Sequence, residues 1–199
     1  GLPELDGRTP MQVARTPHMD RLAIEGCGGL VQMIPESRHP GSDVGNLEIF
    51  GYDSTVHYTG RAPLEAASMA IPMGPDDVAW RCNTISRDGD TLVDYSAGHI
   101  STEEGRALIE AIAEHLQTAD IRFYPGVGYR HIVVYTGGPE QLTSHAPHDI
   151  MGQSIQSHLP EGAGQEQIRG LMDQAEPILV AHPVNENRIA QGQASANAI

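Results

Sequence analysis

One serine stands where local structure would best support a nucleophile. Ser42 follows the turn Pro40-Gly41, and apolar residues then recur at helical spacing, at positions 44, 47 and 50. The pattern predicts a helix that begins at Ser42. A hydroxyl there lies near backbone N–H groups and in the positive field of the helix dipole, which suits an anionic phosphoryl group. Serine needs a base or a metal ion to attack at neutral pH. The alternative is that Ser42 is only the N-cap of the helix.

Three arginines are candidates for gripping an anionic substrate. Arg61, Arg81 and Arg130 each stand among turn or polar residues, and Arg130 opens an apolar strand. The planar guanidinium binds phosphate or carboxylate with two hydrogen bonds. The alternative for each is a surface ion pair, since the chain offers 26 acidic residues.

The ten histidines supply candidates for acid–base chemistry. His99 follows a predicted strand that ends near Asp94, and an imidazole beside a carboxylate can move protons. The pair His148-Asp149 is a second candidate. His145 and His148 have a spacing found among metal ligands, but two ligands do not make a site. Each loop histidine could equally be a polar residue satisfied by its neighbours.

Helices and short strands alternate around these residues. Helices are expected over 17–25, from 42 to about 50, over a short segment after Arg61, from a capping box at 101–104, over 168–180 and over 185–190. Pro177 should kink or end the 168–180 helix. Strands are expected over 30–34, over 78–85 paired as a hairpin with 91–95, over 121–124 and over 129–135. The alternation predicts an α/β fold with a mixed or antiparallel sheet in its second part, beyond a soft boundary between about residues 55 and 75.

Composition narrows the classes of partner. The net charge is −14 and all 12 basic residues are arginine. Such a chain repels nucleic acid and anionic membrane surfaces, so neither is expected as a partner. No apolar run is long enough to span a bilayer. Cys27 and Cys82 are far apart and fit no disulfide framework, which favours reduced thiols and a cytoplasmic location.

Several segments taken together resemble one enzyme family. They are PGSDVGNL at 40–47, GYD at 51–53, YTGRAPLEA at 58–66, RCN at 81–83, DYSAGHIS at 94–101, YPGVGYRH at 124–131, PHDI at 147–150 and HPVN at 182–185. In this order they look like the archaeal-type, 2,3-bisphosphoglycerate-independent phosphoglycerate mutases, which belong to the alkaline phosphatase superfamily.

The resemblance implies a reaction and roles for residues. It implies interconversion of 3-phosphoglycerate and 2-phosphoglycerate in glycolysis through a phosphoserine, without 2,3-bisphosphoglycerate. Ser42 would be the nucleophile and a ligand of one of two divalent ions, manganese, magnesium or zinc. His99 would be catalytic and shuttle a proton. Arg61, Arg130 and Asp94 would bind the small phosphorylated carboxylate.

The resemblance also implies a domain plan. Residues 1–60 would be part of the metal-binding, alkaline-phosphatase-like core, 61–185 an inserted α/β cap that binds substrate and closes over it, and 186–199 a segment returning to the core. The family's other metal ligands have no counterpart here, so this chain alone is expected to be inactive. Two alternatives stay open: a related phosphotransferase such as a proposed homoserine kinase, and a non-catalytic binding module. A homo-oligomer is also left open.

Overall fold

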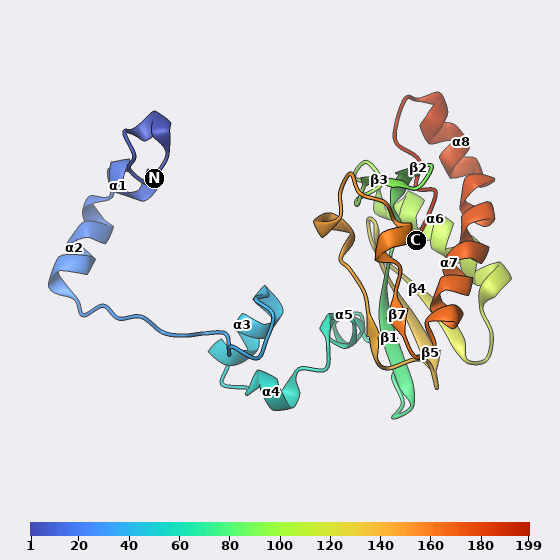
Figure 1. Cartoon of the computed structure of the whole chain (residues 1–199), viewed down its shortest axis with the longest axis horizontal. Helices are drawn as coiled ribbons and strands as arrows, with labels where there is room; N and C mark the ends of the chain where they lie inside the picture. The colour runs from blue at the N-terminus through green and yellow to red at the C-terminus, as the bar shows by residue number, and fades with distance from the viewer. The chain divides into compact units, whose positions relative to one another are not determined.

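The chain forms two units. A computed structural model describes residues 1–199, which divide into unit 1, Gly1–Tyr58, and unit 2, Thr59–Ile199. Figure 1 colours the elements of unit 1 from blue to cyan and those of unit 2 from cyan to red. The expected ranges 1–60, 61–185 and 186–199 were defined by their roles in a larger fold, and those roles stay a prediction.

Unit 1 contains helices and no strand. Its helical elements are η1 (Pro3–Leu5), α1 (Pro10–Val13), α2 (Pro17–Glu25), α3 (Ser42–Ile49) and α4 (Ser54–His57). Pro17 begins α2 and Gly26 follows its last residue, as predicted. The predicted strand over 30–34 is wrong. Leu30 and Val31 are exposed, and no neighbouring strand is available to satisfy their backbone groups, which a β-strand requires.

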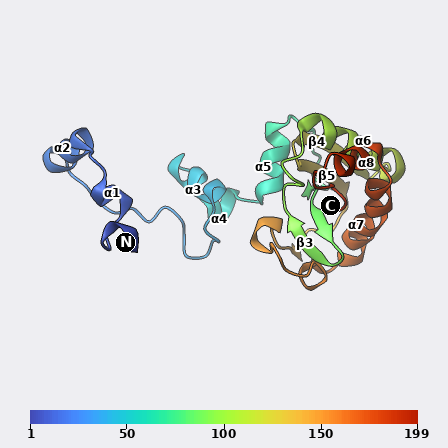
Figure 2. The ribbon, with the colours of Figure 1, turned by 90° about the horizontal axis from the view of Figure 1, so that it is seen from above.

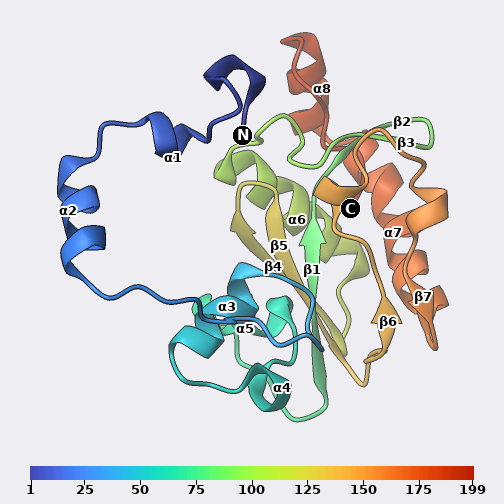
Figure 3. The same cartoon turned by 60° about the vertical axis from the view of Figure 1, so that its left-hand side comes forward.

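Unit 2 is built on a three-stranded antiparallel sheet. Its strands are β1 (Asp77–Asn83), β5 (Arg130–Thr136) and β4 (Ile121–Val127), in the order β1-β5-β4. Figure 3 shows the three strands side by side. Two smaller antiparallel pairs are β2 (Ser86–Asp88) with β3 (Thr91–Asp94), and β6 (Leu142–Thr143) with β7 (Glu161–Gly162). The α/β class with an antiparallel sheet is therefore confirmed.

The predicted hairpin is correct only around its turn. β2 and β3 are joined by the turn Gly89-Asp90, but the long strand β1 pairs with β5 instead of with the 91–95 segment. The reason is the break at Thr84, whose N–H donates to the Tyr129 carbonyl while Ile85 pairs with Ala198. The chain therefore changes partner between β1 and β2.

Helices cover both faces of the main sheet. They are α5 (Arg61–Ser68), α6 (Thr102–Leu116) and α7 (Gln165–Val180). Unit 2 also contains α8 (Pro183–Ala190) and the short turns η2 (Pro147–Asp149) and η3 (Gln156–His158). The alternating side chains of the strands separate two cores. Leu108, Ile112 and Leu179 pack against one face, whereas Ala62 and Ala66 of α5 pack against the other. Figure 2 shows α5 on the side of the sheet opposite α6 and α7.

Local signals account for the helix ends in unit 2. Ser101 and Glu104 form the predicted capping box of α6, with each side chain bonded to the other's backbone N–H. Pro177 lies in the last turn of α7, which continues to Val180. The predicted helix at 185–190 is α8, which Pro183 begins.

Candidate active site

Ser42 is the first residue of α3. The N-cap is Gly41 and makes no side-chain capping bond, so the interpretation of Ser42 as the N-cap is wrong. The residue is exposed, and the first turn of an α-helix directs its backbone N–H groups toward the N-terminal end. The dipole of the helix adds positive potential at this end. An exposed hydroxyl in this position suits the binding and transfer of a phosphoryl group.

Polar contacts within unit 1 connect α3 to α4. The Tyr58 hydroxyl donates to the Asp43 carboxylate, next to Ser42 in the chain. The Arg38 guanidinium lies 5.7 Å from the centre of the Tyr58 ring, and its Nη2 donates to the Ser54 carbonyl at 2.7 Å. No motif pointed to Arg38, whose only signal in the sequence is a cation four residues before the candidate nucleophile.

Asp94, the last residue of β3, and His99, in the loop that follows it, lie close together. Asp94 Oδ1 accepts from both the N–H and the hydroxyl of Ser96 at 2.7 Å, and Ser96 Oγ in turn accepts the His99 N–H at 3.1 Å. Burial opposes ionisation of Asp94. The bonds from Ser96 and the Gly98 N–H, with nearby His99, outweigh it and hold the pKa of this carboxyl below its usual range. Asp94 is therefore an anion that helps to fold the loop.

His99 has an unusual backbone conformation. Ala97, Gly98 and His99 have successive φ angles of 50°, 65° and 52°, which places two residues with side chains in the left-handed region. Such conformations are unfavourable for residues other than glycine and persist where surrounding contacts hold them. The side chain of His99 is exposed. The loop therefore presents the imidazole outward from a fixed backbone.

An aromatic series connects this loop to two other motifs. The Tyr95 ring packs edge-to-face on Tyr129, with centres 5.7 Å apart, and on His148 at 6.1 Å. The guanidinium of Arg130 lies 5.5 Å from the centre of the Tyr129 ring. Three segments that are far apart in the sequence therefore meet around Tyr95.

The register of the sheet places Arg130 near Arg81. Arg130 is opposite Asn83, and Arg81 is opposite Ile132, so the two arginines lie diagonally on one face. Glu65 of α5 lies 3.2 Å from Arg81 Nε, and Arg61 is one helical turn before Glu65. Arg61 and Arg130 are exposed. Arg81 thus has an ion-pair partner in Glu65, and both side chains are partly buried.

The histidine pairs do not form a metal centre. His145 packs edge-to-face on His158, with ring centres 4.9 Å apart, and His148 lies 3.6 Å from Asp149. No group of three His, Cys, Asp or Glu side chains that could hold a metal ion occurs in the chain. Within unit 2, the structure brings Asp94 and His99 together and links their loop to Arg130 through Tyr95 and Tyr129. Ser42 belongs to unit 1.

Comparison with known proteins decides the family. The model of the 2,3-bisphosphoglycerate-independent phosphoglycerate mutases matches residues 23–185. The chain belongs to this family. A protein of Geobacter sulfurreducens, named "Probable 2,3-bisphosphoglycerate-independent phosphoglycerate mutase", is 51% identical over 98% of this chain and 50% of its own length. The 2,3-bisphosphoglycerate-independent phosphoglycerate mutase of Methanosarcina acetivorans is 46% identical, again over 98% of this chain and 50% of its own.

A solved structure of the family shares the fold. It is the cofactor-independent phosphoglycerate mutase of Thermoplasma acidophilum, with a TM-score of 0.62 and 26% identity over 99% of this chain and 53% of that one. The chain thus spans about half the length of the curated relatives it matches. No helix combines the length and the apolar composition that crossing a membrane requires.

Proposed function

We propose that the protein containing this chain interconverts 3-phosphoglycerate and 2-phosphoglycerate in glycolysis, without 2,3-bisphosphoglycerate. The observation that carries the proposal is the place of Ser42, an exposed hydroxyl on the first residue of α3 within the range matched by the family. The names of the relatives support the reaction. The relatives reported above give no support to a homoserine kinase or to a non-catalytic module.

The proposed chemistry proceeds in two balanced transfers. Ser42 Oγ forms a bond to phosphorus while the bond from phosphorus to the 3-oxygen of glycerate breaks, and the serine proton ends on that oxygen. After glycerate turns, its 2-oxygen attacks the phosphoserine, loses its proton and releases Ser42, which takes a proton back. Backbone N–H groups at the start of α3 stabilise the negative phosphoryl oxygens.

Unit 2 contributes binding and proton transfer in this proposal. Arg61 and Arg130 grip the carboxylate or phosphate of the substrate, because a guanidinium offers two parallel donors. Asp94 binds the glycerate from the end of β3, beside the loop that carries His99. His99 moves the proton between solvent and the glycerate oxygens, since an imidazole can both accept and donate a proton. Exclusion of water by this unit favours transfer over hydrolysis.

The metal ions implied by the family enter the proposal only for the whole protein. Ser42 would be the one ligand that this chain supplies to a pair of manganese, magnesium or zinc ions. The residues present do not fit a two-metal centre, since no three metal-binding side chains gather here. On this proposal the 199-residue chain is inactive by itself, and the whole protein is cytoplasmic.

The test is mutase activity of the complete coding sequence that contains these residues. Manganese is supplied, 2,3-bisphosphoglycerate is omitted, and Ser42→Ala is compared with Ser37→Ala, which alters an exposed serine of the same unit. Activity lost by at least about 1,000-fold in Ser42→Ala and kept in Ser37→Ala supports the proposal, because removing a nucleophile costs on that order or more. A folded, metal-loaded protein that is inactive, or an active Ser42→Ala variant, would overturn it.

A further inference from the structure

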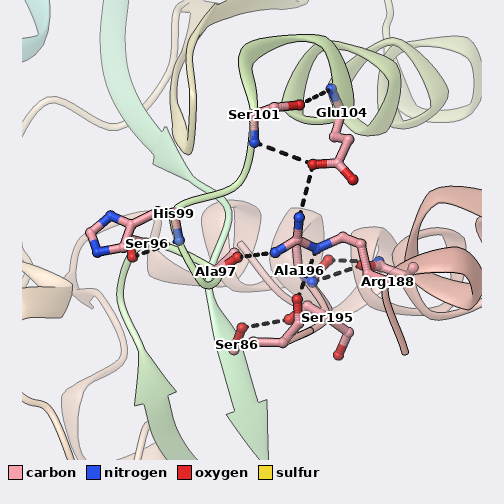
Figure 4. A network of polar contacts seen from close by, with 11 residues as sticks. Ser86, Ser96, Ala97, His99, Ser101, Glu104, Arg188, Ser195 and Ala196 are labelled. Carbon is pink, nitrogen blue, oxygen red and sulfur yellow. Dashed lines mark hydrogen bonds and ion pairs between the residues drawn. The ribbon is translucent and has the colours of Figure 1, made fainter. Parts of the chain in front are cut away.

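Arg188 is a buried cation that joins three separate segments of unit 2. Only 4% of the residue is exposed. Its Nε donates to the Ala194 carbonyl at 2.8 Å, its Nη1 to Glu104 Oε2 at 2.8 Å and its Nη2 to the Ala97 carbonyl at 2.7 Å. Figure 4 shows the bonds from the guanidinium to Glu104 and Ala97. A planar group with donors in fixed directions can hold three acceptors in one geometry.

The contact with Glu104 connects Arg188 to the start of α6. Glu104 Oε2 also accepts the Ser101 N–H at 3.2 Å, and the Ser101 hydroxyl accepts the Glu104 N–H at 3.2 Å. The carboxylate that completes the capping box is therefore the same one that neutralises the buried guanidinium. A buried charge is tolerated when it is paired and hydrogen-bonded in this way.

The contact with Ala97 holds the left-handed turn before His99. Ala97 is fully buried in the core, while its carbonyl accepts from Arg188. At Gly98 an added Cβ would lie 3.2 Å from both Arg188 Nη2 and the Ala194 side chain. The turn thus packs directly against the guanidinium. Ala97 and His99 keep an unfavourable backbone conformation because Arg188 and the core fix the inner side of the turn.

The other end of the network is anchored by the last residues of the chain. The Asn185 side chain donates to Ala196 O at 2.9 Å and accepts from Ala196 N at 2.7 Å. Ser86 Oγ donates to Ser195 O at 2.5 Å, as Figure 4 also shows. α8 and the tail are held without help from the loop, so Arg188 reaches Ala97 from a support fixed elsewhere.

We propose that Arg188 is a positioning residue for His99. It acts through the Ala97 carbonyl and sets the backbone from which the imidazole points outward. The inference rests on the proposed function in giving His99 a proton-transfer role. Misplacing a reacting group by about 1 Å can cost on the order of 100-fold in rate.

The experiment uses the complete, metal-loaded protein with Arg188→Met and Arg188→Lys. Methionine keeps much of the volume and removes the donors, whereas lysine keeps the charge and cannot reach all three acceptors. Val134→Ala is the control, because it weakens the core against α5 and contacts no part of this network. Measurements are kcat, KM and hydrogen exchange of the His99 and Ile100 amides, which donate to Ser96 Oγ and Ser96 O.

The expected result separates positioning from general stability. In Arg188→Met, we expect kcat to fall about 10- to 100-fold, KM to change less than about threefold, and the two amides to exchange faster. In Arg188→Lys, kcat and the exchange rates should lie between those of Arg188→Met and those of the parent. Val134→Ala changes neither kcat nor these two amides. In a His99→Ala background, Arg188→Met lowers kcat no further, since both changes remove the same contribution.

The outcomes against the proposal are equally definite. Unchanged kcat and amide exchange in Arg188→Lys overturn it, even where Arg188→Met fails to fold. The proposal is also overturned if the kcat losses of Arg188→Met and His99→Ala are fully additive, because Arg188 then acts on a group other than His99. If the parent protein has no mutase activity, the proposed function fails, while exchange at His99 still decides whether Arg188 fixes the loop.

Discussion

Unit 1 and unit 2 differ in how much of each is buried. In unit 1 only Val44 and Ser54 are buried, and large apolar residues such as Ile24, Leu30 and Phe50 are exposed. Unit 2 holds three hydrophobic clusters, including the fully buried Leu108 and Leu179. Burial of apolar area is the main favourable contribution to folding. Within this chain, unit 2 therefore has a stabilising core, whereas unit 1 depends on local helix signals.

The two cysteines offer the largest contrast between the units. Cys27 of unit 1 is exposed, while burial of Cys82 in unit 2 raises the pKa of its thiol to about 12. The thiolate is the reactive form, so we expect Cys82 to be alkylated at least about 1,000-fold more slowly than Cys27 at pH 8. Peptide mass spectrometry after timed iodoacetamide treatment measures both rates. In denaturant the two rates should converge, and comparable rates in buffer would break the contrast.

Core truncations should separate the units next. Leu179→Ala removes a fully buried side chain of α7, and we expect a loss of about 2–5 kcal/mol in the free energy of unfolding. Ile24→Ala, at a residue that is 84% exposed in unit 1, should change it by less than about 0.5 kcal/mol. Urea titration of the 199-residue chain followed by Trp80 fluorescence measures both. Equal losses would show that unit 1 shares the cooperative core of unit 2.

The same contrast explains what could be predicted from the sequence. Helix ends depend on neighbouring residues, so Pro17, Gly26 and the Ser101–Glu104 box predicted them in both units. Strands need partners distant in the chain, which is why the 30–34 strand was wrong and β1 was paired with the wrong segment. Motifs indicated Asp94, His99 and Arg130, but a series that joins them through Tyr95 depends on tertiary packing. Arg188 carried no signal, because one arginine in a helix is ordinary and its three acceptors lie on other segments.

A buried histidine makes the stability of unit 2 depend on pH. His131 is 1% exposed; its Nδ1 accepts the Gly126 N–H at 3.1 Å, and burial lowers its pKa from 6.5 to about 4. Between these values the unfolded chain binds the proton and the folded chain does not. Stability is therefore lost as the pH falls from 6.5 to 4, by up to about 3 kcal/mol.

The variant His131→Asn isolates this effect. The Asn oxygen can accept the Gly126 N–H but does not titrate. The loss of unfolding free energy between pH 6.5 and pH 4 should therefore be about 3 kcal/mol smaller in the variant than in the parent. Urea titrations at several pH values measure the difference. If the parent and the variant lose stability in parallel, some other group of unit 2 is responsible.

Glycine-to-alanine substitutions should give the smallest changes in the free energy of unfolding, and their effect on unit 2 should depend on which unit holds the glycine. Gly98, Gly89 and Gly51 have φ angles of 65°, 53° and 83°, so alanine is strained at each. Only at Gly98 would the added Cβ meet other atoms, 3.2 Å from Ala194 Cβ and Arg188 Nη2; the other two face open space. We expect Gly89→Ala to lower the unfolding free energy of unit 2 by about 1 kcal/mol and Gly98→Ala by about 2 kcal/mol. Gly51→Ala lies in unit 1 and should leave the transition of unit 2 within about 0.5 kcal/mol of the parent, because a residue outside the core does not share its cooperative unfolding. Equal losses of unfolding free energy in Gly98→Ala and Gly89→Ala would mean that the loop around Gly98 can move to accommodate the added Cβ, and that Arg188 does not hold it in place.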